Sequence, residues 1–374
     1  MNFEKAHQAT TESASVGTGR EDTDLDRHVA GLPHGLVHDT RMPGDEPVLE
    51  RPAPQPAESS GPSPVAYPGG SPLPPSSSGL HGESLRGVPA HVGQRPPSYP
   101  PRPLRCPSLE DGDEFAAFTP AVLLDGAEAG RLTVRAASVR GDSHNWEGSC
   151  RQDAMTVTRI GPPGAEFLLL AVADGLGSAR NSHSGSYQVT RQVALHLHRA
   201  AHVIDEAFKA ADEGELRALA NKVIAHAVSE LPIDQDHATT LHVLLVPTDA
   251  AVRERVLFSV GDGGLFILRD GHWTRRGPAD ESALLDTRTE ALPHAYRSVK
   301  AALFRSEPGE VLMLGTDGIT NPLTQRNPEF AQYLAGAWGG PEIPSLSDFL
   351  WQAQTRAKSY DDDRTVICVW EEGA

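Results

Sequence analysis

Beyond about residue 107, the apolar positions follow two periodicities that predict different elements. Short apolar or alternating runs are typical of strands, and they occur at residues 131–138, 154–160, 167–173, 238–246, 256–260, 265–268, 311–314 and 365–370. Apolar positions three or four residues apart predict helices at residues 184–204, 215–231 and 347–358. Glycine-rich turns predict hairpins at residues 261–264 and 270–271.

The order of these elements predicts the fold class. Strands come first, then a pair of helices, further strands, another helix and a final strand, with no regular alternation. Segregated runs of this kind are typical of α+β proteins. We expect two packed antiparallel β-sheets flanked by helices, an α-β-β-α sandwich.

The amino-terminal part of the chain has a different composition. Nineteen of the 31 prolines lie at or before Pro107, among many serines and glycines. Such a segment buries too little apolar surface to offset the entropy lost on ordering. We therefore expect a disordered tail over residues 1–105 and a folded domain over residues 106–374. A solvated linker is a better interpretation of this tail than a ligand for a proline-recognising groove.

Charge and cysteine content exclude several protein classes. A net charge of −17 leaves no basic stripe for nucleic acid and fits an anionic membrane surface poorly. The three cysteines form no C-x-x-C pair, which excludes a disulfide scaffold and an ordinary zinc finger. The longest clean apolar run, residues 167–173, is too short to cross a membrane. We expect a cytoplasmic protein with neither nucleic acid nor membrane as a partner.

Aspartates stand at the ends of four predicted strands. Asp174-Gly175 and Asp317-Gly318 each follow an apolar strand, whereas Asp153 and residues 361–363 precede one. A single Asp-Gly pair is more often a plain turn. If these strand ends converge, however, the carboxylates repel one another, and bound cations relieve the repulsion. Oxygen ligands alone favour Mg²⁺ or Mn²⁺, and two such ions can hold a phosphoryl group and activate water.

Five ordered segments carry a family resemblance. They are Gly141 to His144 with Gln152-Asp153-Ala154; residues 172–178; residues 238–241 with residues 260–263; residues 316–318; and residues 362–366. Over roughly residues 136–370, this set resembles the metal-dependent protein phosphatases of the 2C type, in particular a bacterial branch. The resemblance implies a helix-flanked β-sandwich with two Mg²⁺ or Mn²⁺ ions.

The resemblance also implies roles for individual residues. Asp174 would bridge both metals and the Gly175 carbonyl would bind one of them. Asp317 and Asp362 would bind the other, and Asp153 would hold a water or lie behind the direct ligands. Asp174, Asp317 and Asp362 are thus the expected catalytic residues, together with His144.

Two of the departures from the family pattern bear on the chemistry. Gly148 stands where many members have a phosphate-gripping arginine, so His144 and Arg151 are the candidates for that role. Leu176 stands where eukaryotic members have a histidine that could protonate the leaving group, which leaves that donor unassigned.

Three residues outside this set have plain structural interpretations. Asp262 is expected to be a hairpin residue rather than a ligand of a third metal. His196 and His198 would point to opposite faces of a helix and so could not share a metal.

The resulting hypothesis is a metal-dependent serine/threonine phosphatase that acts on phosphorylated proteins. A cognate Ser/Thr kinase is left open as a further partner. One alternative is a catalytically weak, phosphatase-like regulatory module that binds phosphoproteins, which the two departures favour. The other is a structural α+β domain in which the Asp-Gly pairs are only turns. Retention of the three costly carboxylates Asp174, Asp317 and Asp362 favours the enzyme over the regulatory module, and an absence of stoichiometric Mn²⁺ binding would favour the structural domain.

Overall fold

The computed structural model describes residues 91–101, 105–249, 251–277, 289–324 and 327–371. The tail expected over residues 1–105 lies mostly outside these ranges. Within them, β1 (His91–Val92) pairs in parallel with β12 (Arg356–Ala357), and the Arg356 guanidinium donates a hydrogen bond to the Tyr99 carbonyl. Residues 91–101 therefore pack on the folded unit, upstream of the boundary expected at residue 105.

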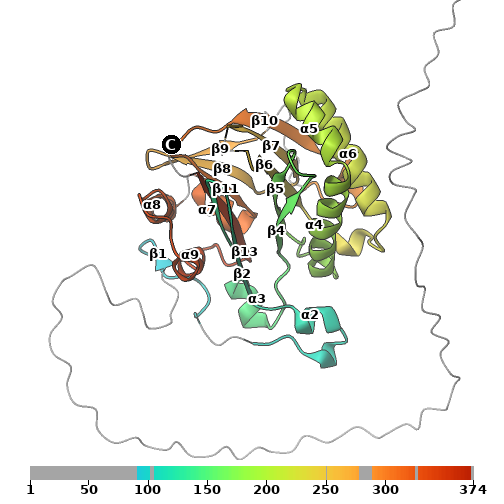
Figure 1. The fold of residues 1–374 in the computed structure, drawn as a ribbon. Coiled ribbons are helices and arrows are strands. Elements are labelled where there is room, and N and C mark those ends of the chain that lie inside the picture. The colour runs from blue at the N-terminus through green and yellow to red at the C-terminus, as the bar shows by residue number, and fades with distance from the viewer. Residues whose placement is uncertain (1–90, 102–104, 250, 278–288, 325–326, 372–374) are drawn as a thin grey trace, which may run out of the picture. The chain divides into compact units, whose positions relative to one another are not determined.

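Two antiparallel sheets form the centre of this unit (Figure 1). The five-stranded sheet has the order β10 (Lys300–Arg305), β7 (Glu254–Val260), β6 (Leu241–Pro247), β5 (Phe167–Ala173) and β4 (Ala154–Ile160). The six-stranded sheet has the order β2 (Val122–Ala129), β3 (Leu132–Val139), β13 (Arg364–Glu371), β11 (Val311–Gly315), β8 (Gly264–Arg269) and β9 (His272–Arg276).

Helices cover the outer face of each sheet (Figure 1). The five-stranded sheet carries α4 (Ser182–Arg199), α5 (Ala201–Lys209) and α6 (Glu213–Ser229). The six-stranded sheet carries α7 (Asp317–Leu323), α8 (Pro328–Trp338) and α9 (Leu346–Ala353). The short helices α2 (Glu114–Phe118) and α3 (Asp142–Glu147) and the turns η1 (Leu109–Asp111), η2 (Gln235–His237) and η3 (His294–Ser298) complete the unit. The predicted α-β-β-α sandwich is confirmed. None of the helices in the described ranges is long and apolar enough to span a bilayer.

The central strand β5 shows why the layers form. Leu169, Ala171 and Ala173 point toward the helices, whereas Leu168 and Leu170 point toward the six-stranded sheet. Both faces are completely covered, so β5 is apolar at every position. A strand buried on both faces has no polar alternation to display.

Most predicted elements are present, with shifted ends. β4 and β5 match their predicted bounds, whereas the predicted helix over residues 184–204 is broken at Ala200 into α4 and α5. The predicted helix over residues 347–358 ends at Ala353, and β12 follows it. β2, β10 and α8 were not predicted. β2 and β10 alternate only weakly because they lie at sheet edges and are partly exposed.

The hairpin predicted at residues 261–264 is wrong. β7 pairs with β6 and β10, whereas β8 pairs with β11 and β9, so these glycines carry the chain from one sheet to the other. Gly261 and Gly263 both have a φ of +92°, a conformation that glycine adopts without strain. The hairpin predicted at Asp270-Gly271 is confirmed, because β8 and β9 pair directly across it.

A buried histidine fixes this crossing between the sheets. His242, on β6, is 1% exposed, and its Nε2 contacts the Asp262 carbonyl. Because a carbonyl only accepts, Nε2 carries the proton and Nδ1 accepts from the Ser259 hydroxyl at 3.0 Å. Burial outweighs the nearby Asp262 and lowers the pKa of His242 to about 4. The imidazole is therefore neutral in the folded protein.

This neutral histidine predicts a loss of stability in acid. The unfolded chain takes up a proton near pH 6.5, whereas the folded chain does so only near pH 4, so stability falls as the pH drops below 6.5. Between pH 7.5 and pH 5, His242 should account for a loss of about 2 kcal/mol in the free energy of unfolding. Urea unfolding at both pH values measures it. His242→Gln should lose less stability over this interval, and an equal loss in both proteins would contradict the assignment.

Candidate metal centre

Strand pairing brings the four predicted strand ends together. Ala154 pairs with Ala173, which places Asp153 and Asp174 at one end of the five-stranded sheet. Gly315 pairs with Val366, which places Asp317 and residues 361–363 at one end of the six-stranded sheet. The two ends meet, because the Thr316 hydroxyl at the end of β11 donates to Asp153 Oδ2 at 2.8 Å. As a consequence, burial and then the charges of Asp153, Asp317, Asp362 and Asp262 raise the pKa of Asp174. Asp262 thus lies near the carboxylates without being part of a hairpin.

Asp153 is the most deeply buried of these carboxylates. It is 3% exposed, and its Oδ2 accepts a hydrogen bond of 2.8 Å from the Thr316 hydroxyl. Its Oδ1 is buried and has no hydrogen-bond partner among the described residues. Burial and the neighbouring Asp363 raise the pKa of Asp153 to about 8. A buried acceptor without a donor calls for a cation or an ordered water.

Two threonines hold the backbone of Asp174. The Asp174 amide donates to the Thr240 hydroxyl at 3.0 Å, and the Asp174 carbonyl accepts from the Thr240 amide at 2.8 Å. The Thr239 hydroxyl donates to the same carbonyl at 2.9 Å. The sequence analysis included this pair only in the segment of residues 238–241, which does not reveal a hydrogen-bonding role.

Asp317 and Asp362 complete the group. Asp317 is the first residue of α7, and burial followed by the charge of Asp362 raises its pKa to about 6. Asp362 is the exposed member of the group. Partial desolvation of its carboxylate, followed by the charge of Asp363, raises its pKa as well. All four carboxylates therefore bind protons more tightly than free aspartate does.

Two glycines allow the segments around this group to approach closely. A Cβ at Gly318 would overlap the Asp363 carbonyl, and a Cβ at Gly175 would lie 2.8 Å from the backbone of Ser182. Gly175 thus lets the start of α4 pack against the residue after Asp174. The glycine after each aspartate therefore has a packing role. For Gly175, this role is additional to the metal binding predicted for its carbonyl.

Asp363 differs from its neighbours. It is 2% exposed and accepts hydrogen bonds from the Gly141 amide and the Gln152 amide, both at 2.6 Å, and from His144 Nδ1 at 2.9 Å. Burial opposes its ionisation, but the hydrogen bond and charge of His144 lower its pKa below the ordinary value. Asp363 is a structural anion that joins the start of β13 to the loop before β4.

His144 and Arg151, the two candidate phosphate contacts, are placed differently. Burial disfavours the charge on His144, but Asp363, Asp362 and Asp153 raise its pKa to about 9, so it is an imidazolium at neutral pH. Arg151 is 3% exposed and donates to the Ser138 hydroxyl at 2.8 Å and to the carbonyls of Pro120 and Asp153. His144 is therefore a cation beside Asp362 and Asp363, whereas Arg151 directs its donors to a hydroxyl and two carbonyls. Gly148 ends α3 with a φ of +91°, and Leu176 is half-buried.

The chain matches the family model described as Protein phosphatase 2C over residues 140–350. This match covers more than half of the chain. The chain belongs to the protein phosphatase 2C family. The phosphatase 2C match includes Asp153, Asp174 and Asp317 and ends before Asp362.

Solved structures similar to this phosphatase 2C chain resemble it weakly in sequence. A serine/threonine phosphatase of S. agalactiae is 17% identical, with a TM-score of 0.45, over 64% of this chain and 100% of that one. RsbX in complex with magnesium is 18% identical, with a TM-score of 0.41, over 67% and 100%. The catalytic domain of the phosphatase PstP with two manganese ions is 20% identical, with a TM-score of 0.39, over 64% and 97%. A comparison with curated proteins gave no match.

The two adjacent aspartates at the start of β13 predict opposite effects on stability. Without metal, Asp363→Asn removes an anion that three donors require, and we expect a loss of about 2 kcal/mol or more in the free energy of unfolding. Asp362→Asn removes a charge whose burial and repulsion by Asp363 outweigh its attraction to His144, and it keeps an oxygen for the Asp363 amide, so we expect a gain. Urea unfolding in EDTA measures both variants. A loss of the same size in both would show that Asp363 has no special structural role.

Proposed function

We propose that this protein is a Mg²⁺- or Mn²⁺-dependent serine/threonine protein phosphatase. The observation that carries the proposal is the convergence of Asp153, Asp174, Asp317 and Asp362 from both sheets, with each pKa raised. A group of anions that repel one another in this way is stabilised by cations. Membership of the protein phosphatase 2C family supports phosphorylated proteins as the substrates.

The donor set fits hard divalent cations. The candidate ligands are the carboxylates of Asp174, Asp317 and Asp362 and the Gly175 carbonyl, all of them oxygen donors. Asp153 lies behind them with one oxygen lacking a partner, so it suits a hydrogen bond to a coordinated water. When bound, two such ions would neutralise the phosphoryl oxygens and lower the pKa of a water that attacks phosphorus.

The protein's own residues supply position and charge. Thr239 and Thr240 fix the backbone of Asp174, and Thr316 fixes one oxygen of Asp153. These contacts prevent the carboxylates from turning away from one another in the absence of cations. A site that is organised before the substrate arrives needs little rearrangement during the reaction.

His144 is the better candidate for the phosphate contact. Its Nδ1 is bound to Asp363, and the positive charge on its ring lies beside Asp362. Arg151 has its donors directed to Pro120, Ser138 and Asp153, which suits support of Asp153 better than contact with a substrate. A hollow of about 690 Å³ opens beside Asp153 and Arg151, lined in part by Phe115, Phe118 and Tyr187. It offers space for residues flanking a phosphorylated side chain.

The alternative is a regulatory module that binds phosphoproteins with little turnover. Gly148 and Leu176 favour it, because they replace a phosphate-gripping arginine and a candidate proton donor. Phosphate hydrolysis by the full chain separates the two functions.

Hydrolysis of p-nitrophenyl phosphate and of a phosphothreonine peptide tests the proposal. With Mn²⁺ or Mg²⁺ we expect turnover that EDTA abolishes. Asp174→Asn and Asp317→Asn should each lower kcat/KM by about 100-fold or more, since each removes a ligand charge. Asp125→Asn, in the exposed edge strand β2, is the control and should keep full activity. Metal binding without turnover on either substrate would favour the regulatory module.

Separate kinetic constants distinguish His144 from Arg151. His144→Gln removes the imidazolium, so we expect KM for the phosphopeptide to rise about 10-fold while the protein stays folded. Arg151→Lys keeps the charge but loses hydrogen bonds, so its effect should appear first in stability. A larger rise in KM for Arg151→Lys, at unchanged stability, would transfer the phosphate contact to Arg151.

A further inference from the structure

A second group of metal-binding side chains lies between α4 and α6, on the helix layer of the five-stranded sheet. His196 comes from α4, and His226 and Glu230 come from the end of α6. Glu230 Oε2 lies 2.9 Å from His196 Nε2, and Glu230 Oε1 lies 3.2 Å from His226 Nε2. One ligand atom from each of the three residues lies within 4.8 Å of the other two. The other group of this kind among the described residues, His144 with Asp362 and Asp363, belongs to the site above.

Helix geometry explains how the three side chains meet. His226 and Glu230 are four residues apart, so they lie on one face of α6. His196 faces them from α4, whereas His198 turns away and its Nδ1 accepts from the Gly161 amide at 3.2 Å. The sequence analysis rightly excluded a metal shared by His196 and His198. It could not show that His196 meets a second helix.

The three side chains are close enough to bind one ion. Around zinc, with bonds of about 2.1 Å, neighbouring ligand atoms lie about 3.4 Å apart. The separations of 2.9 and 3.2 Å join the two histidines to different oxygens of Glu230, and one ligand atom from each of the three residues lies within 4.8 Å of the others. His226 Nε2 is buried and makes no well-directed hydrogen bond among the described residues, although it lies beside the carboxylate. A buried nitrogen without a directed partner is available to a cation when it carries no proton.

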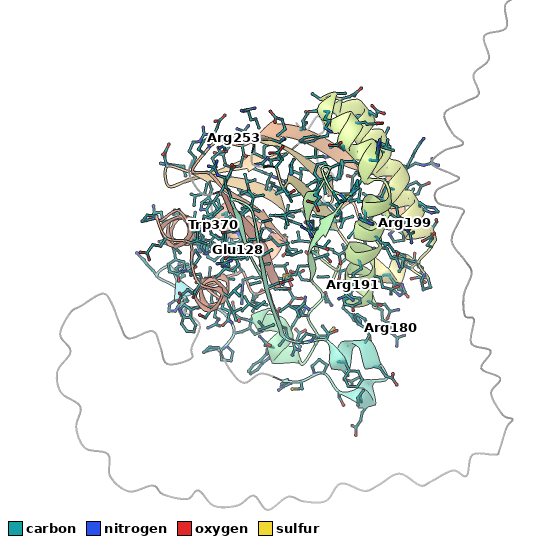
Figure 2. The ribbon with its side chains drawn as sticks, viewed as in Figure 1. Glu128, Arg180, Arg191, Arg199, Arg253 and Trp370 are labelled. Carbon is teal, nitrogen blue, oxygen red and sulfur yellow. The ribbon has the colours of Figure 1, made fainter. Side chains whose placement is uncertain are left out.

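The electrostatics also favour a metal. Burial is the main cause that lowers the pKa of His196. Glu230 raises this pKa, and His226 and Arg199 lower it. His196 is therefore neutral, which is the form that binds metals. Both histidines lie in the last turn of their helices, where the helix dipole favours positive charge. Figure 2 labels Arg199 at this end of α4.

We propose that His196, His226 and Glu230 bind a zinc ion that ties α4 to α6. Two imidazole nitrogens and one carboxylate are ligands that zinc accepts and magnesium does not prefer. Three protein ligands leave the fourth position to water. The proposal does not rest on the phosphatase activity, because the site shares no residue with the carboxylate group.

Zinc binding to the full chain tests the proposal in the presence of millimolar Mg²⁺, which occupies oxygen ligands. We expect one zinc per chain that His226→Gln and Glu230→Gln abolish, measured as bound metal after gel filtration. With zinc at about 100 times its Kd, the unfolding temperature of the wild type should rise by about 5 °C or more. The same variants should show no rise. Bound Co²⁺ should give the visible absorption of a tetrahedral ion in the wild type alone.

Matched controls come from α5 and α4. His202 and Glu206 form another pair four residues apart, 3.4 Å from each other and exposed, with no third ligand in the described group. His202→Gln and His198→Gln should therefore bind zinc as the wild type does. His226 and Glu230 have side chains that are 39% and 44% exposed, so their variants should unfold at the wild-type temperature without zinc.

Two results would overturn the proposal. One is a wild type that binds no zinc beyond the amount that His226→Gln binds. The other is an equal loss of zinc in the His202→Gln control, which would indicate non-specific binding by surface histidines. Neither result bears on phosphate hydrolysis, since the readouts are bound metal, absorption and unfolding temperature.

Discussion

The structure depends on one constraint, the repulsion among aspartates that two sheets hold at a common end. Asp153 and Asp174 are fixed by the pairing of β4 with β5, and Asp317 and Asp362 by the pairing of β11 with β13. Asp153 and Asp174 adjoin paired strands and Asp317 begins α7, so their backbone positions are fixed, whereas Asp362 lies two residues before β13. The repulsion is then relieved by protonation or by bound cations. The raised pKa values of Asp153 and Asp317 show that these carboxylates bind protons more tightly than free aspartate does. Cation binding is therefore coupled to the stability of the whole sandwich.

Asp363 has the opposite role, because its carboxylate is stabilised as an anion. It stands next to Asp362 in the chain, yet its charge is fully used by two amides and the imidazolium of His144. These contacts join the start of β13, in one sheet, to the loop that leads into β4, in the other. One firmly hydrogen-bonded carboxylate thus holds together the segments that carry the repelling ones. Because of these hydrogen bonds, the pKa of Asp363 is lowered, whereas the pKa of Asp362 is raised.

The sequence predicted the parts of the fold whose signal is local. β5 was located exactly because complete burial makes it apolar throughout, and the carboxylates were found because each adjoins such a strand. The turn at residues 261–264 was misassigned because glycines with positive φ serve a hairpin and a crossing between sheets equally well. The hydrogen bonds of Thr239 and Thr240 to Asp174 join positions more than sixty residues apart, and no local pattern encodes such contacts.

The two candidate metal groups differ in whether they need a cation for charge balance. The carboxylates repel one another strongly and need cations for charge balance, whereas Glu230 already lies against both histidines and burial lowers the pKa of His196. Both groups contact α4. Its first residue, Ser182, packs against Gly175, and the Ser186 hydroxyl donates to the Gln152 carbonyl beside Asp153, while His196 lies in its last turn. An ion that orders the end of α4 therefore acts on the helix that supports the carboxylates, and any such coupling must be reciprocal.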